Sequence, residues 1–583
     1  MPRTAILLLI FSAAAIALAC PDVRHLATII PGDSGDAILN LWILRAVQSG
    51  IPHGWRGLWN APIYSPELRT LAYSDAMLPI ALAHWPLRLA VGDAFAFNIL
   101  YLASWIACSW STWRLAERYT HTSGAALVGA LAFTYASVRL VHHQHFQLVV
   151  GGALVPLAVL ALVRCLTAPS PARGLLSGLT FAVLALTSTY YGAMTGIMAV
   201  VIVAGGLIVE RPSTMTQWKA LTIGLGLSAL VAAALVGPVA AQYVRLQRRP
   251  EFRRTPDAGI AAHVNDFLST SPESRLLASA PLIGVRSRPE SRGIENRLFP
   301  GLVATPLALA GLLAAGAAIR RRATPRTHEL LIVVASGFVV LVLAFGDRIA
   351  IGGREIVLPF AALRRFAPGF AGIRATARLA LGGQLAIALL AAFGFDAFLR
   401  HRSRNWQLIL TGAAMLLIAA ESATGLASVR VPGAGDDGGV MEALAAQPGG
   451  VVLELPIESS ARGVAWPYVE MPRQLVAIDD GHTRVNGYSG FEPPGFAART
   501  ERLNRFPDPA AVDEARRLGV RFVVLRTALV GTPSPASVES RLSADGVGRY
   551  ADATAGGMLR SLAAGQMSSV VRLRGAYLIE LRR

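Results

Sequence analysis

Two carboxylates, Asp33 and Asp36, lie three residues apart just after the first hydrophobic segment of the chain. A carboxylate at the boundary between membrane and water can take a proton from a hydroxyl group, which is the work of a general base. The same spacing suits the start of a helix, where an aspartate caps the first turn by accepting a backbone N–H. On spacing alone, capping and catalysis are equally good interpretations.

Other polar residues fall on the same predicted side of the membrane as this pair. Arginines bind phosphate through paired donors, so we expect the set to include substrate-binding residues. The histidines also fit a polar turn, the tyrosines an aromatic belt and the arginines an anchor for lipid headgroups. The candidates are Glu67, Asp75, His142, His145, Gln147, Tyr190, Tyr191, Arg374 and Arg378.

The three histidines at 142, 143 and 145 raise the question of a zinc site. They lie too close in sequence to converge on one ion without further ligands, so a polar turn is favoured. The three cysteines have no spacing typical of a metal site or a disulfide framework.

The composition is that of a polytopic membrane protein. Apolar residues make up 53% of the 583 positions, charged residues 15%, and the mean hydropathy is +0.48. The net charge is +18, but the arginines are dispersed between apolar runs and not gathered on one domain, which argues against nucleic-acid binding. Orientation of the loops and contact with anionic lipids explain the charge better.

The apolar runs predict about eleven transmembrane helices. Loops on one side of them are basic, as cytoplasmic loops are. The first long loop, the loop 243–300 and everything after 426 then lie outside, which predicts a multi-pass membrane protein. The predicted spans are 4–20, 95–113, 123–140, 147–164, 174–190, 191–209, 220–242, 301–319, 329–346, 377–399 and 406–425.

The expected architecture is an all-α membrane bundle with a large first outer loop, followed by a small soluble α/β domain. We expect a transmembrane domain over 1–425, a flexible linker over 426–440 and an extracytoplasmic α/β domain over 441–583. Helices lying along the interface are predicted at Ala37–Gln48 and Ser74–Leu89. In the last domain, strands are predicted at Val451–Leu455, Arg521–Leu525 and Ala576–Leu581, and a helix at Pro509–Leu518.

Several short motifs resemble a bacterial group of membrane glycosyltransferases of the GT-C superfamily. In the first loop these are Gly35–Trp42, Asn60–Pro66 and Leu71–Asp75. Between the spans they are His145–Leu148, Ser188–Tyr191, Leu298–Gly301 and Arg374–Arg378. In the last domain they are Val452–Pro456 and Asn486–Phe491, so the resemblance runs nearly from end to end.

The resemblance implies a sugar donor linked to polyprenyl phosphate, transfer on the outer face, and an acidic residue of the first outer loop as general base. Asp36 matches that motif position best, and Asp33 is the second candidate. No cofactor is certain. The first loop has no Asp-x-Asp pair, so dependence on a divalent metal, Mg or Mn, stays open.

We therefore expect an inverting glycosyltransferase whose acceptor is a glycan, a lipid or a protein. One alternative is a carrier or flippase for lipid-linked intermediates, which needs a polar path through the spans. A transferase needs a polar cluster at one face, which is the pattern seen. The other alternative is a non-catalytic subunit of envelope polysaccharide assembly, acting through its outer domain.

Overall fold

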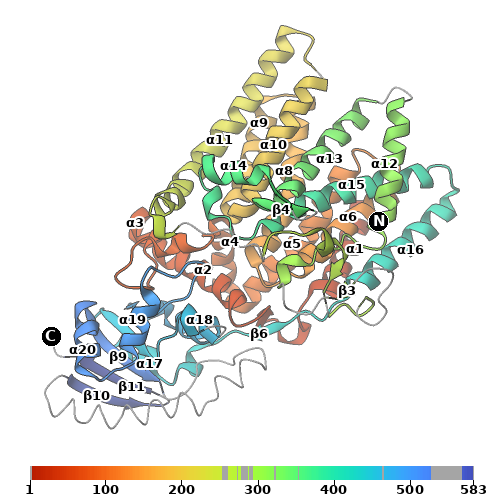
Figure 1. Ribbon diagram of the computed structural model, residues 1–583. Helices are drawn as coiled ribbons and strands as arrows, with labels where there is room; N and C mark the ends of the chain where they lie inside the picture. Colours follow the sequence, from red (N-terminus) through yellow and green to blue (C-terminus); the bar gives the residue numbers. More distant parts are fainter. Residues whose placement is uncertain are drawn as a thin grey trace. The chain divides into compact units, whose positions relative to one another are not determined.

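The computed structural model shows a largely helical chain with a small sheet region (Figure 1). Contacts divide the chain into two compact units. The first comprises Met1–Cys20, Ile99–Gln247 and Arg253–Leu426, and the second Pro21–Asn98, Arg248–Phe252 and Ala427–Arg583. The residues that the structure describes are 3–209, 211–252, 260–271, 273–277, 286–287, 293–320, 324–351, 354–462, 465–526, 567–574 and 576–581.

Helices predominate among the described residues of the first unit. Each of the predicted spans contains a helix, although the span 123–140 is divided between two. Six helical segments within the described residues are long and apolar enough to cross a membrane: α5, α8, α10, α11, α13 and Thr376–Leu399. The larger helices are α1 (Arg3–Ala19), α5 (Asp93–Ala116), α6 (Ser123–Thr134), α7 (Ser137–Leu140), α8 (Phe146–Thr167), α9 (Pro171–Thr187), α10 (Thr189–Val209), α11 (Met215–Gln247), α12 (Ala304–Arg320), α13 (Pro325–Ala344), α14 (Pro359–Phe366), α15 (Ala380–Leu399) and α16 (Arg404–Ser422).

Helix starts in this unit follow from local sequence. The hydroxyl of Ser170 accepts a hydrogen bond from the backbone N–H of Arg173 at 3.3 Å, and Pro171 opens α9. Thr324 caps α13 in the same way. The hydroxyl accepts one of the backbone N–H groups that have no partner at the start of a helix. Proline has no N–H, so its place in the first turn leaves no donor unsatisfied.

Small residues allow the close packing of α12 against α15. A Cβ added to Gly311 would lie 2.0 Å from the carbonyl oxygen of Leu390. A Cβ added to Gly394 would lie 2.2 Å from the carbonyl oxygen of Leu307. Backbones can approach this closely only where side chains are absent, which is typical of packing between membrane helices.

A mixed five-stranded sheet forms the centre of the second unit, in the order β10-β11-β9-β7-β8. β7 is parallel to β8 and β9, whereas β11 is antiparallel to β9 and β10. Helices α17 (Val440–Ala445) and α20 (Pro509–Arg517) contact the sheet (Figure 1). The three predicted strands and the predicted helix are confirmed. The strands are β7 (Val451–Leu455), β8 (Thr483–Arg484), β9 (Val520–Arg526), β10 (Met567–Leu573) and β11 (Ala576–Leu581).

The first outer loop belongs to this second unit, a grouping that the sequence did not indicate. Its strand β1 (Ile29–Pro31) pairs antiparallel with β6 (Ser428–Arg430). The segment predicted as a linker therefore contains a strand, followed by a short 3₁₀ helix and the start of α17. The reason is hydrogen bonding across the sequence, since β6 has its partner almost 400 residues away.

The two helices predicted in the first loop are present, as α2 (Asp36–Gly50) and α4 (Leu78–Val91). They do not behave alike. Nearly every residue of α2 is buried, because it packs against α4 and against α18 (Ala465–Val476). An interfacial helix would keep one face exposed, so α2 is a core helix of the second unit, and the interfacial prediction is wrong for it.

Candidate functional sites

The loop that enters α2 is organised around Asp33. Its Oδ1 accepts hydrogen bonds from the backbone N–H groups of Gly35 and Asp36, each at 3.0 Å, and its Oδ2 accepts one from the hydroxyl of Tyr468 at 3.2 Å. Asp33 is therefore the capping carboxylate of the pair. Asp36 is the first residue of α2 and is half-buried.

The electrostatics of Asp33 differ from those of an ordinary surface acid. Burial and the neighbouring charge of Asp36 raise its pKa, while the hydrogen bonds from Gly35, Asp36 and Tyr468 act in the opposite direction. The other first-loop candidates, Glu67 and Asp75, are half-buried in the same unit.

Motifs from the first loop meet a motif of the last domain inside the second unit. The backbone N–H of Tyr64 donates to the carbonyl oxygen of Asn486 at 3.0 Å. The hydroxyl of Ser74 lies 3.0 Å from that of Ser489 and accepts a hydrogen bond from the N–H of Gly490 at 2.9 Å. Two motifs of the first loop are thus hydrogen-bonded to the Asn486–Phe491 motif.

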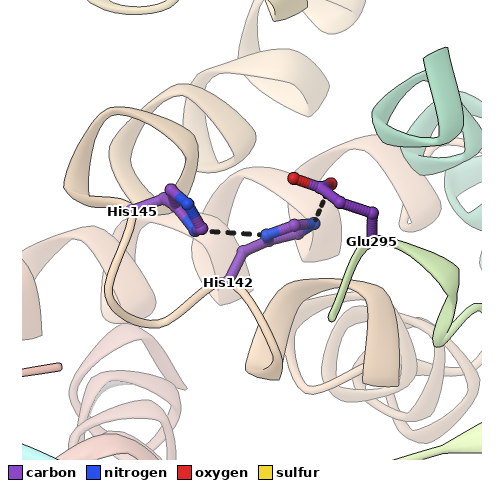
Figure 2. A group of neighbouring side chains, drawn as sticks. All are labelled: His142, His145 and Glu295. Atoms are coloured by element: carbon purple, nitrogen blue, oxygen red, sulfur yellow. Dashed lines mark hydrogen bonds and ion pairs between the residues drawn. The ribbon is translucent and has the colours of Figure 1, made fainter. Parts of the chain in front are cut away.

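A second group of candidates gathers in the first unit around His142 (Figure 2). Its Nδ1 lies 3.3 Å from Nδ1 of His145, and its Nε2 lies 3.2 Å from a carboxylate oxygen of Glu295. Figure 2 shows the imidazole of His142 between the other two side chains. All three residues are buried, and one ligand atom from each lies within 4.8 Å of the others.

The backbone explains how these residues are held. His142 and His145 occupy the tight turn between α7 and α8, in which the N–H of His145 donates to the carbonyl oxygen of His142 at 2.9 Å. Glu295 lies in the 3₁₀ helix η8 (Ile294–Asn296). The side chain of Asn296 fixes that helix by donating to the carbonyl oxygen of Ala261 and to Asp266.

Arg378 completes the group. Its guanidinium forms a bidentate ion pair with Glu295, with N–O distances of 2.5 to 3.1 Å, and lies 4.9 Å from the ring centre of Tyr190. The hydroxyl of Tyr190 accepts hydrogen bonds from the backbone N–H groups of Arg374 and Ala375. The side chain of Arg374 is exposed.

Burial and charge act in opposite directions on the acid of this group. Burial alone would raise the pKa of Glu295, but Arg378 and His142 hold it well below its usual range. Burial also lowers the pKa of His142, although the adjacent carboxylate opposes the change. Glu295 is therefore a carboxylate beside the imidazole of His142, an arrangement able to bind a cation or to relay a proton.

The structure thus brings together four residues selected from sequence: His142, His145, Tyr190 and Arg378. Of the remaining candidates in this unit, Gln147 is half-buried near the start of α8 and Tyr191 is buried in α10. Asp36 belongs to the other unit. A pocket shared by Asp36 with Arg374 or Arg378 remains a prediction.

Sequence reasoning missed Glu295 and Tyr468. Glu295 lies three residues before the Leu298–Gly301 motif, and that proximity to a motif was the available signal. Tyr468 lies in α18 with nothing in its local sequence to link it to Asp33.

The first unit also contains an apolar cavity of about 570 Å³. Side chains of α8, α9, α10 and α11 line it, including Val159, Phe181, Val203 and Leu225. Only Ser177, Thr195 and Ser228 add hydroxyl groups. Such a lining suits a hydrocarbon chain.

Comparison with known proteins agrees with this architecture. A family model described as Domain of unknown function (DUF6311) matches residues 5–423. No curated protein matches the chain.

Solved structures supply the likeness in fold. The arabinofuranosyltransferase AftD from Mycobacteria is similar, with a TM-score of 0.59 and 15% identity over 100% of this chain and 40% of AftD. A mutant of AftD has a TM-score of 0.56 and 16% identity, over 91% of this chain and 37% of the mutant chain. The oligosaccharyltransferase of Archaeoglobus fulgidus has a TM-score of 0.49 and 12% identity, over 89% of this chain and 68% of its own. The chain spans about 40% of the length of AftD, and the GT-C fold indicated by sequence is confirmed.

Proposed function

The chain belongs to the DUF6311 family, and from its fold and its first-loop geometry we propose that it is a membrane glycosyltransferase. Its donor is a sugar linked to polyprenyl phosphate. Its acceptor is a hydroxyl group of a glycan, lipid or protein on the outer face of the cytoplasmic membrane. A general-base mechanism inverts the anomeric carbon.

The observation that carries the proposal is the different environment of the two first-loop carboxylates. Asp33 is occupied with three hydrogen bonds that hold the loop and the start of α2. Asp36 contributes its N–H to that cap, and its side chain extends from the first turn of a rigid, buried helix. Rigid support is what a general base needs, because proton transfer depends on position. We therefore assign the base to Asp36 and the positioning of the loop to Asp33.

The reaction is a single displacement. Asp36 takes the proton of the acceptor hydroxyl as its oxygen attacks the anomeric carbon, and the bond from that carbon to the phosphate oxygen breaks. Negative charge then develops on the leaving phosphate, where a guanidinium stabilises it. Arg374 is the better candidate for this role, because Arg378 is already engaged by Glu295 and the side chain of Arg374 is exposed.

The apolar cavity supports a donor with a hydrocarbon chain. Its lining is almost wholly aliphatic and aromatic, and three of the helices that line it, α8, α10 and α11, are long and apolar enough to span a membrane. A prenyl chain gains free energy from leaving water and needs no polar partner.

The test is complementation of a cell that lacks this protein. Polyprenyl-phosphate sugars and surface glycans would be measured by mass spectrometry in cells that carry the wild type, Asp36→Asn or Asp22→Asn. Loss of a general base reduces turnover by roughly a hundredfold to ten-thousandfold. We therefore expect Asp36→Asn to accumulate the donor and lose one surface sugar, as the deletion does.

Asp22→Asn is the matched control, an acid of the same loop that pairs with Arg24 at the surface. We expect it to behave as the wild type. If Asp36→Asn, present in the membrane at normal amounts, restores the surface sugar fully, the assignment of the base is wrong. A deletion that alters neither donor nor surface glycan would reject the transferase itself.

A further inference from the structure

The cluster of His142, His145 and Glu295 is not used in the reaction above, yet it is buried and chemically unusual. The relative exposure of the three residues is 2%, 7% and 9%. Two segments about 150 residues apart in the sequence supply them. Burial of three titratable groups costs free energy unless they satisfy one another or a bound ion.

The distances in the cluster match those around a metal ion. Zinc binds nitrogen at about 2.0–2.1 Å, so two donors in a tetrahedral site lie about 3.3–3.4 Å apart. The Nδ1 atoms of His142 and His145 are 3.3 Å apart and face one another. Two facing nitrogens can share one proton, and a metal ion that replaced this proton would need little movement of either ring.

Glu295 prepares His142 for this role. Its Oε2 lies 3.2 Å from Nε2 of His142, and a proton on that nitrogen leaves the lone pair of the imidazole on Nδ1. A carboxylate that holds the far N–H of a histidine is the usual outer partner of a metal-bound imidazole.

Arg378 holds Glu295 without competing for the histidines. It donates chiefly to Oε1, through Nε at 3.0 Å and Nη2 at 2.5 Å. Oε2 therefore remains directed at His142. Stacking on Tyr190 gives Arg378 a second fixed contact, so the acid is oriented before any ion arrives.

We propose that His142 and His145, supported by Glu295, form a binding site for a divalent transition-metal ion in the membrane unit. Imidazole nitrogens favour zinc and the other late first-row ions over magnesium and calcium, which prefer oxygen. With two imidazole ligands, coordination positions stay open for water or for oxygens of an anionic ligand. The site is separate from Asp36 in the sequence and does not require that Asp36 be a base.

The test measures metal binding directly. The full chain, purified with a tag free of histidine, would be stripped with a chelator in lipid nanodiscs. It would then be dialysed against Zn²⁺ or Mg²⁺ and analysed by mass spectrometry for bound metal. We expect about one tightly bound zinc ion per chain and no comparable magnesium. Cobalt bound in its place should give the intense visible absorption of a tetrahedral site.

His143→Ala is the matched control, because His143 lies in the same turn but hydrogen-bonds to the carbonyl oxygen of Leu140. We expect it to bind zinc as the wild type does. His145→Ala and the double variant His142→Ala/His145→Ala should lose the ion, and Glu295→Gln should weaken binding tenfold to a hundredfold.

The proposal is overturned if the wild type binds no more zinc than the double variant, or if His143→Ala loses as much. Thermal unfolding of each chelator-treated variant shows whether it is folded, and His145→Gln replaces any alanine variant that is not. Binding needs no turnover, so failure here leaves the glycosyltransferase proposal standing, and failure of Asp36→Asn to reduce transfer leaves this site standing.

Discussion

Two buried charge clusters, one in each unit, are built on different principles. In the second unit, Glu454 accepts hydrogen bonds from Arg484 and Arg526 at 2.8 to 2.9 Å. These arginines also pair with Asp480 and Asp437. In the first unit, Glu295 pairs with Arg378 and with His142. The imidazole of His142 in turn contacts that of His145.

The difference separates a structural network from a candidate site. Burial would raise the pKa of Glu454, but Arg526 and Arg484 lower it to about 2, so the network stays charged and closed at every physiological pH. The cluster of Glu295 includes two imidazole nitrogens that face each other at 3.3 Å. A network in which every buried charge is paired stabilises the fold. Two facing imidazole nitrogens can instead bind a ligand.

The largest effect is expected from Glu454→Gln. Removal of this charge leaves Arg484 and Arg526 buried with one carboxylate each, and breaking a buried pair costs about 3–5 kcal/mol. Guanidinium titration of the purified chain in detergent would measure the loss of unfolding free energy. Glu580→Gln, which breaks a half-exposed pair with Arg521 in the same sheet, is the control and should cost less than about 1 kcal/mol. Equal costs would contradict the closed-network interpretation.

A pH-dependent effect is expected from Glu470, which lies beside this network. Burial raises its pKa from 4.5 to about 7, against the influence of Arg473. A raised carboxyl pKa gives stability that is complete below about pH 4.5 and is lost as pH rises through 7, by up to about 3 kcal/mol. Glu470→Gln should therefore gain stability relative to the wild type from pH 5 to pH 8. If the wild type and Glu470→Gln have parallel pH profiles of unfolding free energy, the raised pKa of Glu470 is contradicted.

A smaller effect is expected from Arg378→Gln in the cluster of the first unit. Glu295 loses its charged donors but keeps the hydrogen bond to His142, so we expect a cost of about 1.5–3 kcal/mol. The measurement is the same titration in the presence of a chelator. A cost as large as that of Glu454→Gln would mean that the two clusters are equally structural.

The smallest effect is expected from Tyr190→Phe. The ring that stacks on Arg378 is kept, but the acceptor for the N–H groups of Arg374 and Ala375 is lost. We expect a cost of about 0.5–1.5 kcal/mol. A larger loss than that of Arg378→Gln would show that the hydroxyl, not the ring, holds the cluster together.

Helices and strands with strong local patterns could be predicted from the sequence. Apolar runs of membrane length gave the helices of the first unit, and short buried runs such as Val451–Leu455 gave strands within a residue or two of their ends. For α2 the helix was predicted, but its position at the membrane interface was wrong. Its mixed apolar and polar spacing resembles that of an interfacial helix. Its polar positions, such as Arg45, are satisfied by Asp93 and Asp479, which are distant in sequence.

The candidate sites also contain some residues that local sequence indicates and others that only distant contacts identify. The histidine turn, Tyr190 and Arg378 were selected from residue type and from motifs, but the carboxylate beside His142 was not. Glu295 supplies it from a long loop in which several other charged residues were equally plausible. Nothing local distinguishes one acid among them.

The sequence by itself determined that this is a membrane protein with an α/β region after the spans, because hydrophobic period and length are local properties of the chain. Its motifs added the resemblance to the GT-C superfamily, and with it the choice of Asp36 before Asp33 as the general base. Only the tertiary structure decided that Asp33 holds the start of α2, that the first loop pairs with β6, and that Glu295 meets His142. Each of these depends on hydrogen bonds or ion pairs between residues distant in sequence, and such pairings are fixed by the folded chain as a whole.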